Sequence, residues 1–370
     1  MATLFLCGDV MTGRGIDQIQ AHPCPPQLQE PYVRDARDYV SLAEETNGRF
    51  PRPVSSSYIW GDALQELQRV APDARIINLE TSVTTSDDFW PGKRIHYRMH
   101  PRNVGCLTAA GVDVCVLANN HVLDYGRAGL AETLGTLADV GLKVTGAGRS
   151  IHQAGEPAIM DLRDGGRILV FAVGAEDSGI AKTWLANSES SGVDLLPDLT
   201  DATADELLRR VCNRKRRGDV AVVSIHWGDN WGYDVPDAHI RFAHRLIDGS
   251  VDLIHGHSSH HPRPIEIYRN KLVLYGCGDF ISDYEGISGY EQFRDDLVVM
   301  YFPRLDRNTG ELIALHMTPL QIRRMQLVRP SAQDRDWLRA RLADVSMDFG
   351  CEISAAPDGT YEVRHIIPAR

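Results

Sequence analysis

The stretch Asp252-Leu-Ile-His-Gly-His-Ser-Ser-His-His-Pro262 places four histidines within seven residues. It begins with an apolar run, continuous with Val251, which predicts a short buried strand. Imidazoles crowded at the end of a buried strand repel each other when they are protonated, so they are usually neutral and share a cation. A polar loop that is rich in histidine is the alternative interpretation. The four histidines are His255, His257, His260 and His261.

The composition allows a large core and argues against a nucleic-acid partner. The chain has 370 residues, of which 43% are hydrophobic and 24% charged. This is enough for one large α/β domain or for two domains. The formal net charge is -11 and the pI is about 5.7. The basic residues at 209–217 are more typical of the solvated end of a helix than of a nucleic-acid site.

Cysteine usage and hydropathy predict a cytoplasmic protein without a membrane anchor. The seven cysteines are an odd number without paired spacing, and most of them lie in or beside apolar runs. That pattern favours reduced thiols over a disulfide framework. The N-terminal segment has no basic region before its apolar residues, and no apolar run approaches the ~18 residues of a membrane span.

Predicted strands alternate with predicted helices along the chain, which indicates an α/β sandwich with mixed sheets. We expect one domain over 1–325 and a C-terminal extension of helix and strand, 326–370, packed on it. Residues 21–57 contain several prolines and predict a long excursion that can act as a lid, because structureless loops of this length are usually functional or disordered. Strands are expected at 3–10, 75–79, 112–118, 143–145, 167–173, 220–225, 251–254, 265–268, 272–275, 297–303 and 312–320, and helices at 62–70, 101–110, 129–140, 204–213, 240–248 and 334–345.

Five predicted strands end in residues of the types that bind metals or carry protons. In open α/β sheets, sites form in the crevice beyond the carboxyl ends of the strands. A single buried Asp at such an end is commonly structural, but five strand ends of this kind are hard to explain structurally. Nitrogen and oxygen ligands suit Mn, Fe, Co or Zn, with Ca or Mg as further options, and a carboxylate can bridge two ions. The residues are Asp9, Glu80, Asn120 with His121, His226, and His257 with His260.

The motifs around these residues resemble those of the poly-γ-glutamate capsule-biosynthesis (CapA-like) proteins, which are distant members of the calcineurin-like metallophosphoesterase fold. The resemblance covers about residues 3 to 303 and is specific in the combination of its motifs. It implies a sandwich of two mixed β-sheets flanked by helices, with a dinuclear metal site. The motifs are Gly8-Asp-Val-Met-Thr-Gly-Arg14, Asn78-Leu-Glu80, Ala118-Asn-Asn-His-Val-Leu-Asp-Tyr-Gly126, Ser224-Ile-His-Trp-Gly228, Gly256-His-Ser-Ser-His260 and Leu274-Tyr-Gly-Cys-Gly-Asp-Phe280.

The resemblance also implies the roles of individual residues. Glu80 would bridge two ions, of which one takes Asp9 and His260 and the other takes Asn120, His226 and His257. His121 would stand beside the metals as an acid/base. Asp124 would orient it, as carboxylates orient imidazoles next to metals, or would cap a helix instead. Arg14 would hold a carboxylate or phosphate of the substrate, or form a surface ion pair.

The chain departs from the phosphoesterases at one position, as CapA-like proteins generally do, and from many CapA-like proteins at others. The phosphoesterases have a histidine where this chain has Met11, a poor ligand for a hard cation. Asp279 stands where many CapA-like proteins have asparagine, and is interpreted as a proton carrier, a ligand or a buried structural residue. His261 is a second candidate acid/base, whereas His255 is expected in the core. Four tryptophans either line a groove for a substrate or belong to the core. They are Trp60, Trp90, Trp231 and Trp227, of which Trp227 is the candidate substrate contact.

Three functions remain open at this point. The first is a metal-dependent hydrolase of a phosphoester or of a peptide or γ-glutamyl-type amide, in which His121 protonates the leaving group. The second is a metal-dependent peptide epimerase, as in soluble relatives from lasso-peptide pathways, in which two groups remove and return a Cα proton. The third is a non-catalytic polymer-binding module, which the cost of burying charge counts against. The expected partner is a small-molecule or peptide substrate, with neither nucleic acid nor membrane.

Overall fold

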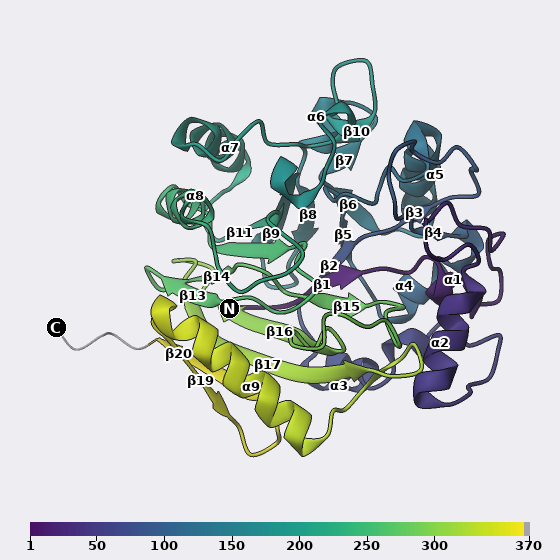
Figure 1. The fold of residues 1–370 in the computed structure, drawn as a ribbon. Helices are drawn as coiled ribbons and strands as arrows, with labels where there is room; N and C mark the ends of the chain where they lie inside the picture. The colour runs from purple at the N-terminus through teal and green to yellow at the C-terminus, as the bar shows by residue number, and fades with distance from the viewer. Residues whose placement is uncertain (366–370) are drawn as a thin grey trace.

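Two mixed β-sheets form the centre of the molecule in the computed structural model, which describes residues 1–365 (Figure 1). In the first sheet β1, β2, β5 and β6 run parallel, and β16 joins β1 antiparallel. In order, its strands are β19 (Cys351–Ala355), β20 (Tyr361–His365), β17 (Leu312–Ile322), β16 (Leu297–Leu305), β1 (Ala2–Val10), β2 (Ala74–Leu79), β5 (Val114–Val116) and β6 (Lys143–Thr145), with β15 (Asp279–Ile281) on β1 and β18 (Leu327–Val328) on β17.

The second sheet has a parallel centre with one antiparallel strand at each edge. The parallel strands β14, β12, β11 and β9 lie next to one another in that order. Across the sheet the strands are β13 (Ile265–Tyr268), β14 (Lys271–Leu274), β12 (Leu253–His257), β11 (Val220–His226), β9 (Arg167–Gly174) and β8 (Ala158–Asp161). Two short pairs stand apart, β3 (Ser82–Val83) with β4 (Arg98–Met99) and β7 (Ala147–Gly148) with β10 (Gly192–Val193).

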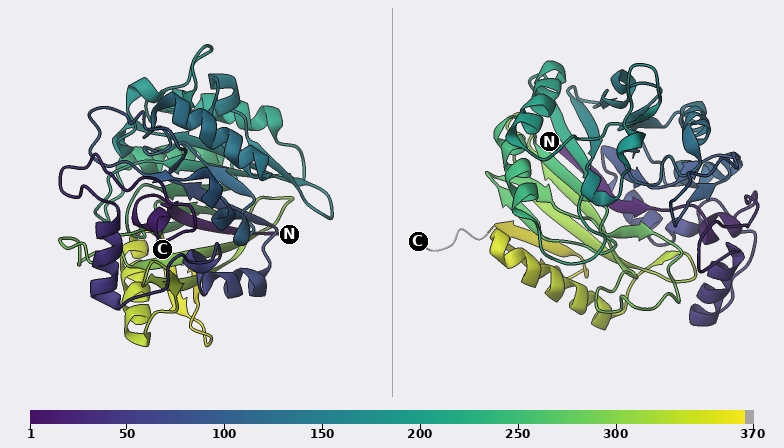
Figure 2. Two further views of the ribbon diagram at one scale, coloured as in Figure 1. Left: turned by 90° about the vertical axis from the view of Figure 1, so that its right-hand side faces the viewer. Right: turned by 45° about the horizontal axis from the view of Figure 1, so that its top comes forward.

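Helices cover the outer faces of the two sheets. Figures 1 and 2 show α7 and α8 on the opposite side of the strands from α9. The α-helices are α1 (Gly15–Gln18), α2 (Arg37–Asn47), α3 (Ala63–Val70), α4 (Gly105–Ala109), α5 (Gly126–Asp139), α6 (Ile151–Ala154), α7 (Asp201–Arg214), α8 (Asp237–Asp248) and α9 (Ala332–Ser346). The expected sandwich of two mixed sheets flanked by helices is therefore confirmed.

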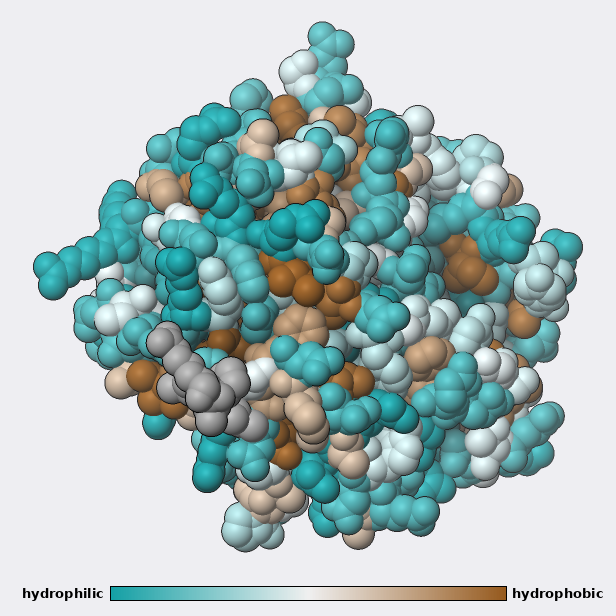
Figure 3. Space-filling view, turned by 60° about the vertical axis from the view of Figure 1, so that its left-hand side comes forward, coloured by the Kyte–Doolittle hydropathy of each residue, from teal (hydrophilic) through white to brown (hydrophobic). Residues whose placement is uncertain are grey.

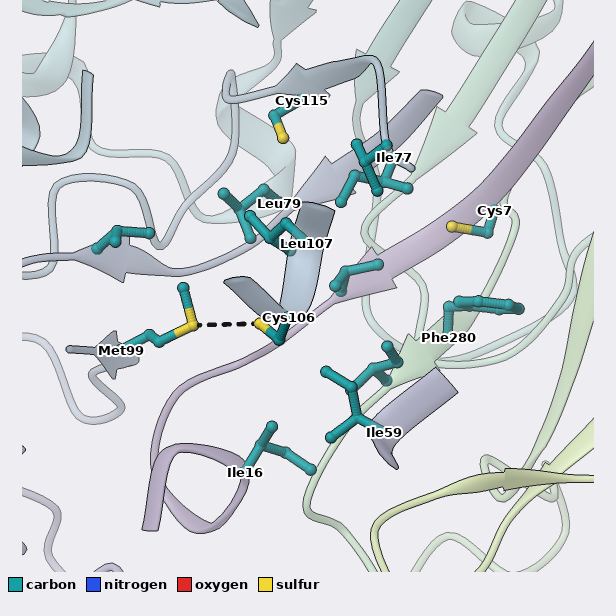
Figure 4. Packing of buried hydrophobic residues seen from close by; sticks show 14 of the residues in the cluster. Cys7, Ile16, Ile59, Ile77, Leu79, Met99, Cys106, Leu107, Cys115 and Phe280 are labelled. Atoms are coloured by element: carbon teal, nitrogen blue, oxygen red, sulfur yellow. Dashed lines mark hydrogen bonds between the residues drawn. The ribbon is translucent and has the colours of Figure 1, made fainter. Parts of the chain in front are cut away.

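The alternation of side chains along each strand divides the core into layers. In β1, Leu4 and Leu6 pack between the two sheets, whereas Phe5 and Cys7 belong to the core cluster outside the first sheet. Figure 4 shows Cys7 in that cluster. In β11, Val222 faces the first sheet and its neighbours face α7 and α8. Each fully buried aliphatic or aromatic side chain contributes roughly 1.5–3 kcal/mol to folding, so the strands are fixed by packing on both faces.

The cysteines are free thiols, as expected. All seven lie within residues 1–365, none forms a disulfide, and six of them are buried. Figure 4 shows Cys106 packed against Met99, with 3.7 Å between the two sulfur atoms. Figure 3 shows a surface on which hydrophilic residues predominate, with small hydrophobic areas between them. Among the described residues, no helix is both long and apolar enough to cross a membrane.

The segment 21–57, expected as a long excursion, is not structureless. The segment contains α2, whose residues Tyr39, Val40 and Ala43 are buried in the core cluster outside the first sheet. Phe50 and Val54 belong to the same cluster. Apolar residues at helical spacing fix the segment to the body of the molecule, although its prolines suggested an irregular loop.

Candidate metal centre

The carboxyl ends of strands from both sheets meet at one place. His226 and His257 are the last residues of β11 and β12 and are direct neighbours across that parallel pair. From the other sheet, Asp9 comes near the end of β1 and Glu80 directly after β2. His255 joins the two sheets here, because its Nε2 atom lies 2.8 Å from the carbonyl oxygen of Cys7. The strand ends that the sequence singles out therefore meet between the two sheets.

His255 is a satisfied core residue, as expected. Its side chain is fully buried, and its Nδ1 atom lies 3.0 Å from the hydroxyl of Ser224. The same hydroxyl lies 2.8 Å from Nε2 of His257. Ser224 therefore fixes the ring of His257 so that its Nδ1 atom faces the centre of the cluster, 2.8 Å from Nδ1 of His226.

Two overlapping groups of side chains can hold a metal ion. In each group, one ligand atom per residue lies within 4.8 Å of the others. Asp9 belongs to both groups, whereas the family resemblance implied that Glu80 is the shared carboxylate. The Glu80 carboxylate lies at the edge, 3.8 Å from Nδ1 of His226 and 3.8 Å from Nε2 of His121. The two groups are Asp9–His226–His257 and Asp9–His260–Asp279.

Unsatisfied polar atoms indicate that these residues fit a cation. Four side-chain atoms of the cluster are buried without a hydrogen-bond partner: Oδ2 of Asp9, Oδ1 of Asn120, Nε2 of His226 and Oδ2 of Asp279. Each such atom costs about 1–3 kcal/mol if it stays unpaired. All four are of the types that coordinate divalent transition metals. Ions bound by the two groups would give partners to the atoms of Asp9, His226 and Asp279, and the expected ligand Asn120 also has an unpartnered Oδ1 atom.

The electrostatics of the cluster also favour a cation. Burial, with repulsion from Asp279, raises the pKa of Asp9 to about 7. Burial and the neighbouring carboxylates Asp9 and Asp279 raise the pKa of Glu80 well above its usual value. Burial lowers the pKa of His226 and of His257 well below the usual range, which leaves neutral imidazoles. Closely spaced carboxylates and neutral imidazoles are the state that a divalent cation stabilises.

Two asparagines that the sequence did not single out as site residues hold the carboxylates in place. The Nδ2 atom of Asn78 donates to Asp9 at 2.7 Å and to Glu80 at 2.8 Å. Asn119 donates in turn to Oδ1 of Asn78 at 2.9 Å. Because the two asparagines are buried, the positions of Asp9 and Glu80 depend on this chain of hydrogen bonds. Both residues lie in the motifs quoted above, which was the only signal for them.

His121 lies at the mouth of the cluster and is bound to Asp124. Its Nδ1 atom lies 2.7 Å from Oδ2 of Asp124, which also accepts from the Tyr97 amide at 2.6 Å. The helix-cap alternative for Asp124 is wrong, because α5 begins at Gly126 and has no side-chain cap. The side chains of His121 and His260 are 10% and 11% exposed, more than those of Glu80, His226 and His257.

Lys93 is a site residue that sequence reasoning missed. Its ammonium group lies 2.9 Å from Nδ1 of His121 and also contacts the Asp124 carboxylate and the carbonyl oxygen of Asn120. Burial lowers its pKa, although Asp124 opposes that shift. It lies between β3 and β4, in a segment without hydrophobic periodicity. Its spacing from other residues gave no sign that it belongs to the site.

The structure corrects the roles expected for His261, Trp227 and Arg14. His261 stacks on Phe293 with 4.6 Å between ring centroids and contacts Tyr233 rather than a carboxylate of the cluster. Trp227 is 1% exposed and donates to the carbonyl of Tyr275, so it is a core residue and not a substrate contact. The buried guanidinium of Arg14 pairs with Asp283 and Glu30, which leaves it a structural role.

A buried cluster of carboxylates and imidazoles, at the meeting strand ends of a two-sheet α/β sandwich, defines a candidate metal-binding protein. Residues 3–284 match the model of the bacterial capsule synthesis protein PGA_cap family, and the chain belongs to that family. The resemblance to CapA-like proteins is thereby confirmed.

Known relatives agree with this assignment. The probable polyglutamine synthesis accessory protein of Mycobacterium tuberculosis (strain ATCC 25618 / H37Rv) is 48% identical over 364 residues, which are 98% of this chain and 96% of that protein. The PGA biosynthesis protein CapA of Bacillus subtilis (strain 168) is 29% identical over 319 residues, 85% of this chain and 70% of that protein. A crystal structure of TT1561 of Thermus thermophilus covers 84% of this chain and 96% of its own, but at 11% identity and a TM-score of 0.38 the likeness is too weak to bear on the fold.

Proposed function

We propose that the chain is a metal-dependent hydrolase that cleaves a phosphoester or a peptide or γ-glutamyl-type amide. The observation that carries this proposal is the coincidence of two features at one set of strand ends. Unpartnered atoms of Asp9, His226 and Asp279 lie there within the two ligand groups, and Asn120 and the His121–Asp124 pair come from the loop after β5. The names of the relatives, which refer to PGA and capsule biosynthesis, favour an amide of a glutamyl polymer among these substrates.

The residues of the chain divide the chemistry between binding and proton transfer. Asp9, Asn120, His226 and His257 would hold an ion, and a divalent ion there supplies Lewis-acid polarisation of a carbonyl or phosphoryl oxygen. Asp124 binds Nδ1 of His121 and leaves Nε2 on the side of Glu80, 3.8 Å away. Burial lowers the pKa of His121 to about 4, so Nε2 is unprotonated in the free site. His121 would take a proton from the attacking water on Nε2 and then give that proton to the leaving group.

Epimerisation of a peptide Cα is the second candidate function, and one observation favours it. The cluster carries two separate imidazole–carboxylate pairs, His121–Asp124 and His260–Asp279, with 2.7 and 2.9 Å between nitrogen and oxygen. One pair would take the Cα proton and the other would return a proton to the opposite face, so no bond other than Cα–H is broken. A non-catalytic polymer-binding module is disfavoured, because it would keep the unpartnered buried atoms at a cost and without use.

The partners follow from the proposed chemistry. We expect a small-molecule or peptide substrate, and no nucleic acid or membrane. A cytoplasmic location likewise stays a prediction.

Incubation in D2O with Mn²⁺ separates the three functions. The substrates are a γ-linked oligoglutamate and an aryl phosphodiester. New amino termini or released phenol support hydrolysis, and deuterium at Cα without cleavage supports epimerisation. The absence of both cleavage and deuterium incorporation would contradict both enzymatic functions. His226→Ala is expected to abolish turnover, whereas His316→Ala, at an exposed position on β17, is the matched control and keeps it.

A further inference from the structure

We infer that Asp279 is a metal ligand, and that with Asp9 and His260 it forms a second ion site beside the Asp9–His226–His257 group. This inference rests on the proposed metal dependence and adds a ligand that this chain supplies from its own sequence. The site would take a divalent cation that accepts two carboxylates and one imidazole, such as Zn²⁺, Mn²⁺ or Fe²⁺.

The backbone places Asp279 beside Asp9. β15 pairs parallel with β1, and these two aspartates are direct neighbours across the pair. The loop before β15 passes so close to β1 that a Cβ atom on Gly8 would lie 1.6 Å from the carbonyl oxygen of Gly278. Phe280, labelled in Figure 4, packs in the core with 5.9 Å between its ring centroid and that of Phe5. The Asp279 carboxylate is therefore held at a fixed position next to that of Asp9.

The hydrogen bonds of the group leave room for an ion. Both carboxylates are at most 1% exposed, and each has an Oδ2 atom without a partner. The Nε2 atom of His260 lies 3.0 Å from the side-chain nitrogen of Asn230, so Nδ1 is the atom that faces the carboxylates. Without an ion, Nδ1 donates to Oδ1 of Asp279 at 2.9 Å, and binding of an ion to Nδ1 would release this proton. Two ligand atoms on one ion lie about this far apart when each metal–ligand distance is near 2.1 Å.

Asp279 also replaces a donor that is missing nearby. Met11, two residues after Asp9, is buried, and its sulfur lies 3.8 Å from the Tyr284 hydroxyl. A thioether is a poor ligand for a hard cation, so β1 supplies only one donor. The backbone amide of Met11 donates to the carbonyl of Ile281 at 2.8 Å. This hydrogen bond joins Met11 directly to β15. The carboxylate of Asp279 thus compensates for the thioether.

Crystals of the full chain grown with Zn²⁺ test the geometry. We expect two anomalous peaks, one of them at roughly 2.0–2.2 Å from a carboxylate oxygen of Asp279. An ion bound by Asp9 and His260 with the Asp279 carboxylate more than about 3 Å away would show that Asp279 only orients His260, and would overturn the inference. This test uses the unmodified protein and does not depend on how any variant folds.

Calorimetric titration of the metal-free protein with Zn²⁺ tests the stoichiometry. Asp279→Asn keeps the shape of the side chain and is expected to lower the number of bound ions from two to one. Glu266→Gln is the control, because Glu266 is a buried carboxylate paired with His244 at 2.9 Å outside the cluster, and it should keep both ions. Two ions bound to Asp279→Asn with unchanged affinity would overturn the inference.

The two proposals fail in different ways. If Asp279→Asn keeps both ions and the wild type hydrolyses its substrate, the inference is wrong and the proposed function stands. If the wild type holds two ions, one of them on Asp279, but turns over no substrate, the function is wrong and the ligand assignment stands. A wild type that binds no Zn²⁺ would overturn both.

Discussion

A single lysine controls the surroundings of the proposed acid/base. Lys93 contacts three groups around His121, namely its Nδ1 atom, the Asp124 carboxylate and the carbonyl oxygen of Asn120. Its side chain is 18% exposed, while that of Asp124 is fully buried. The ammonium group therefore compensates a buried carboxylate and holds the loop between β3 and β4 against the residues that follow β5.

Substitution of this lysine should separate positioning from metal binding. Lys93→Met keeps the length of the side chain and removes the charge and the hydrogen bonds. We expect kcat to fall by about 10- to 100-fold, less than the full contribution of a general acid, because His121 and Asp124 remain. KM and the number of bound metal ions should change little. Steady-state kinetics measure kcat and KM, and metal analysis measures the number of bound ions. A loss of bound metal with unchanged kcat would contradict this role.

The residues of the site were predictable where they follow strands. Asp9, His226 and His257 could be found because an apolar run precedes each of them and parallel strands end at a common edge. Lys93 could not be found, since it lies in an irregular segment and reaches the site only through tertiary contacts. His261 was misplaced for a related reason, because adjacency to His260 says nothing about which way a loop side chain points.

At the scale of elements, one buried carboxylate connects α3 to the C-terminal part of the chain. Glu66 on α3 accepts from Thr318 on β17 at 2.7 Å and from Arg329, after β18, at 2.9 Å. Arg69 in the next turn of α3 also pairs with it. Burial raises the pKa of Glu66, but these donors outweigh burial and lower the pKa overall. The ionised form therefore stabilises the packing of α3 against the first sheet.

The contribution of Glu66 should depend on pH. A carboxyl group with a lowered pKa stabilises the folded state above its unfolded pKa of about 4.3, and this contribution is lost as the pH falls through the folded pKa. Glu66→Gln should lower the free energy of unfolding by about 1.5–3 kcal/mol at pH 7 and by less below pH 4. Urea unfolding at both pH values measures this. Glu352→Gln, on the exposed side of β19, should change stability by less than about 0.5 kcal/mol.

Elements with a clear period were predicted better than irregular ones. The strands at the centre of each sheet match apolar runs in the sequence. The short strand β15 was missed, because Asp279–Ile281 offers three residues without alternation and forms a strand only by pairing with β1. The helix α2 was missed because the prolines around it outweighed its apolar positions.

The whole molecule is organised around the contact between its two sheets. Apolar side chains from both sheets pack in the layer between them, and the cluster lies where the strands end. Asp9 and Asp279 come from the first sheet, whereas His226 and His257 come from the second. The fold class could be predicted from the order of elements and the family motifs. The distribution of ligands between the sheets depends on how they pack, which no local pattern specifies.

Because the ligands come from both sheets, metal binding should stabilise the whole molecule against unfolding. An ion that binds only the folded protein stabilises it by about 2.7 kcal/mol when the free concentration is 100 times Kd. We expect the thermal unfolding midpoint to rise with Mn²⁺ concentration and to fall on addition of EDTA, as measured by calorimetry. His226→Ala should lose part of this dependence, because it removes a ligand of the Asp9–His226–His257 group, which joins the two sheets. Equal midpoints with Mn²⁺ and with EDTA would contradict a metal shared between the sheets, whatever reaction the site performs.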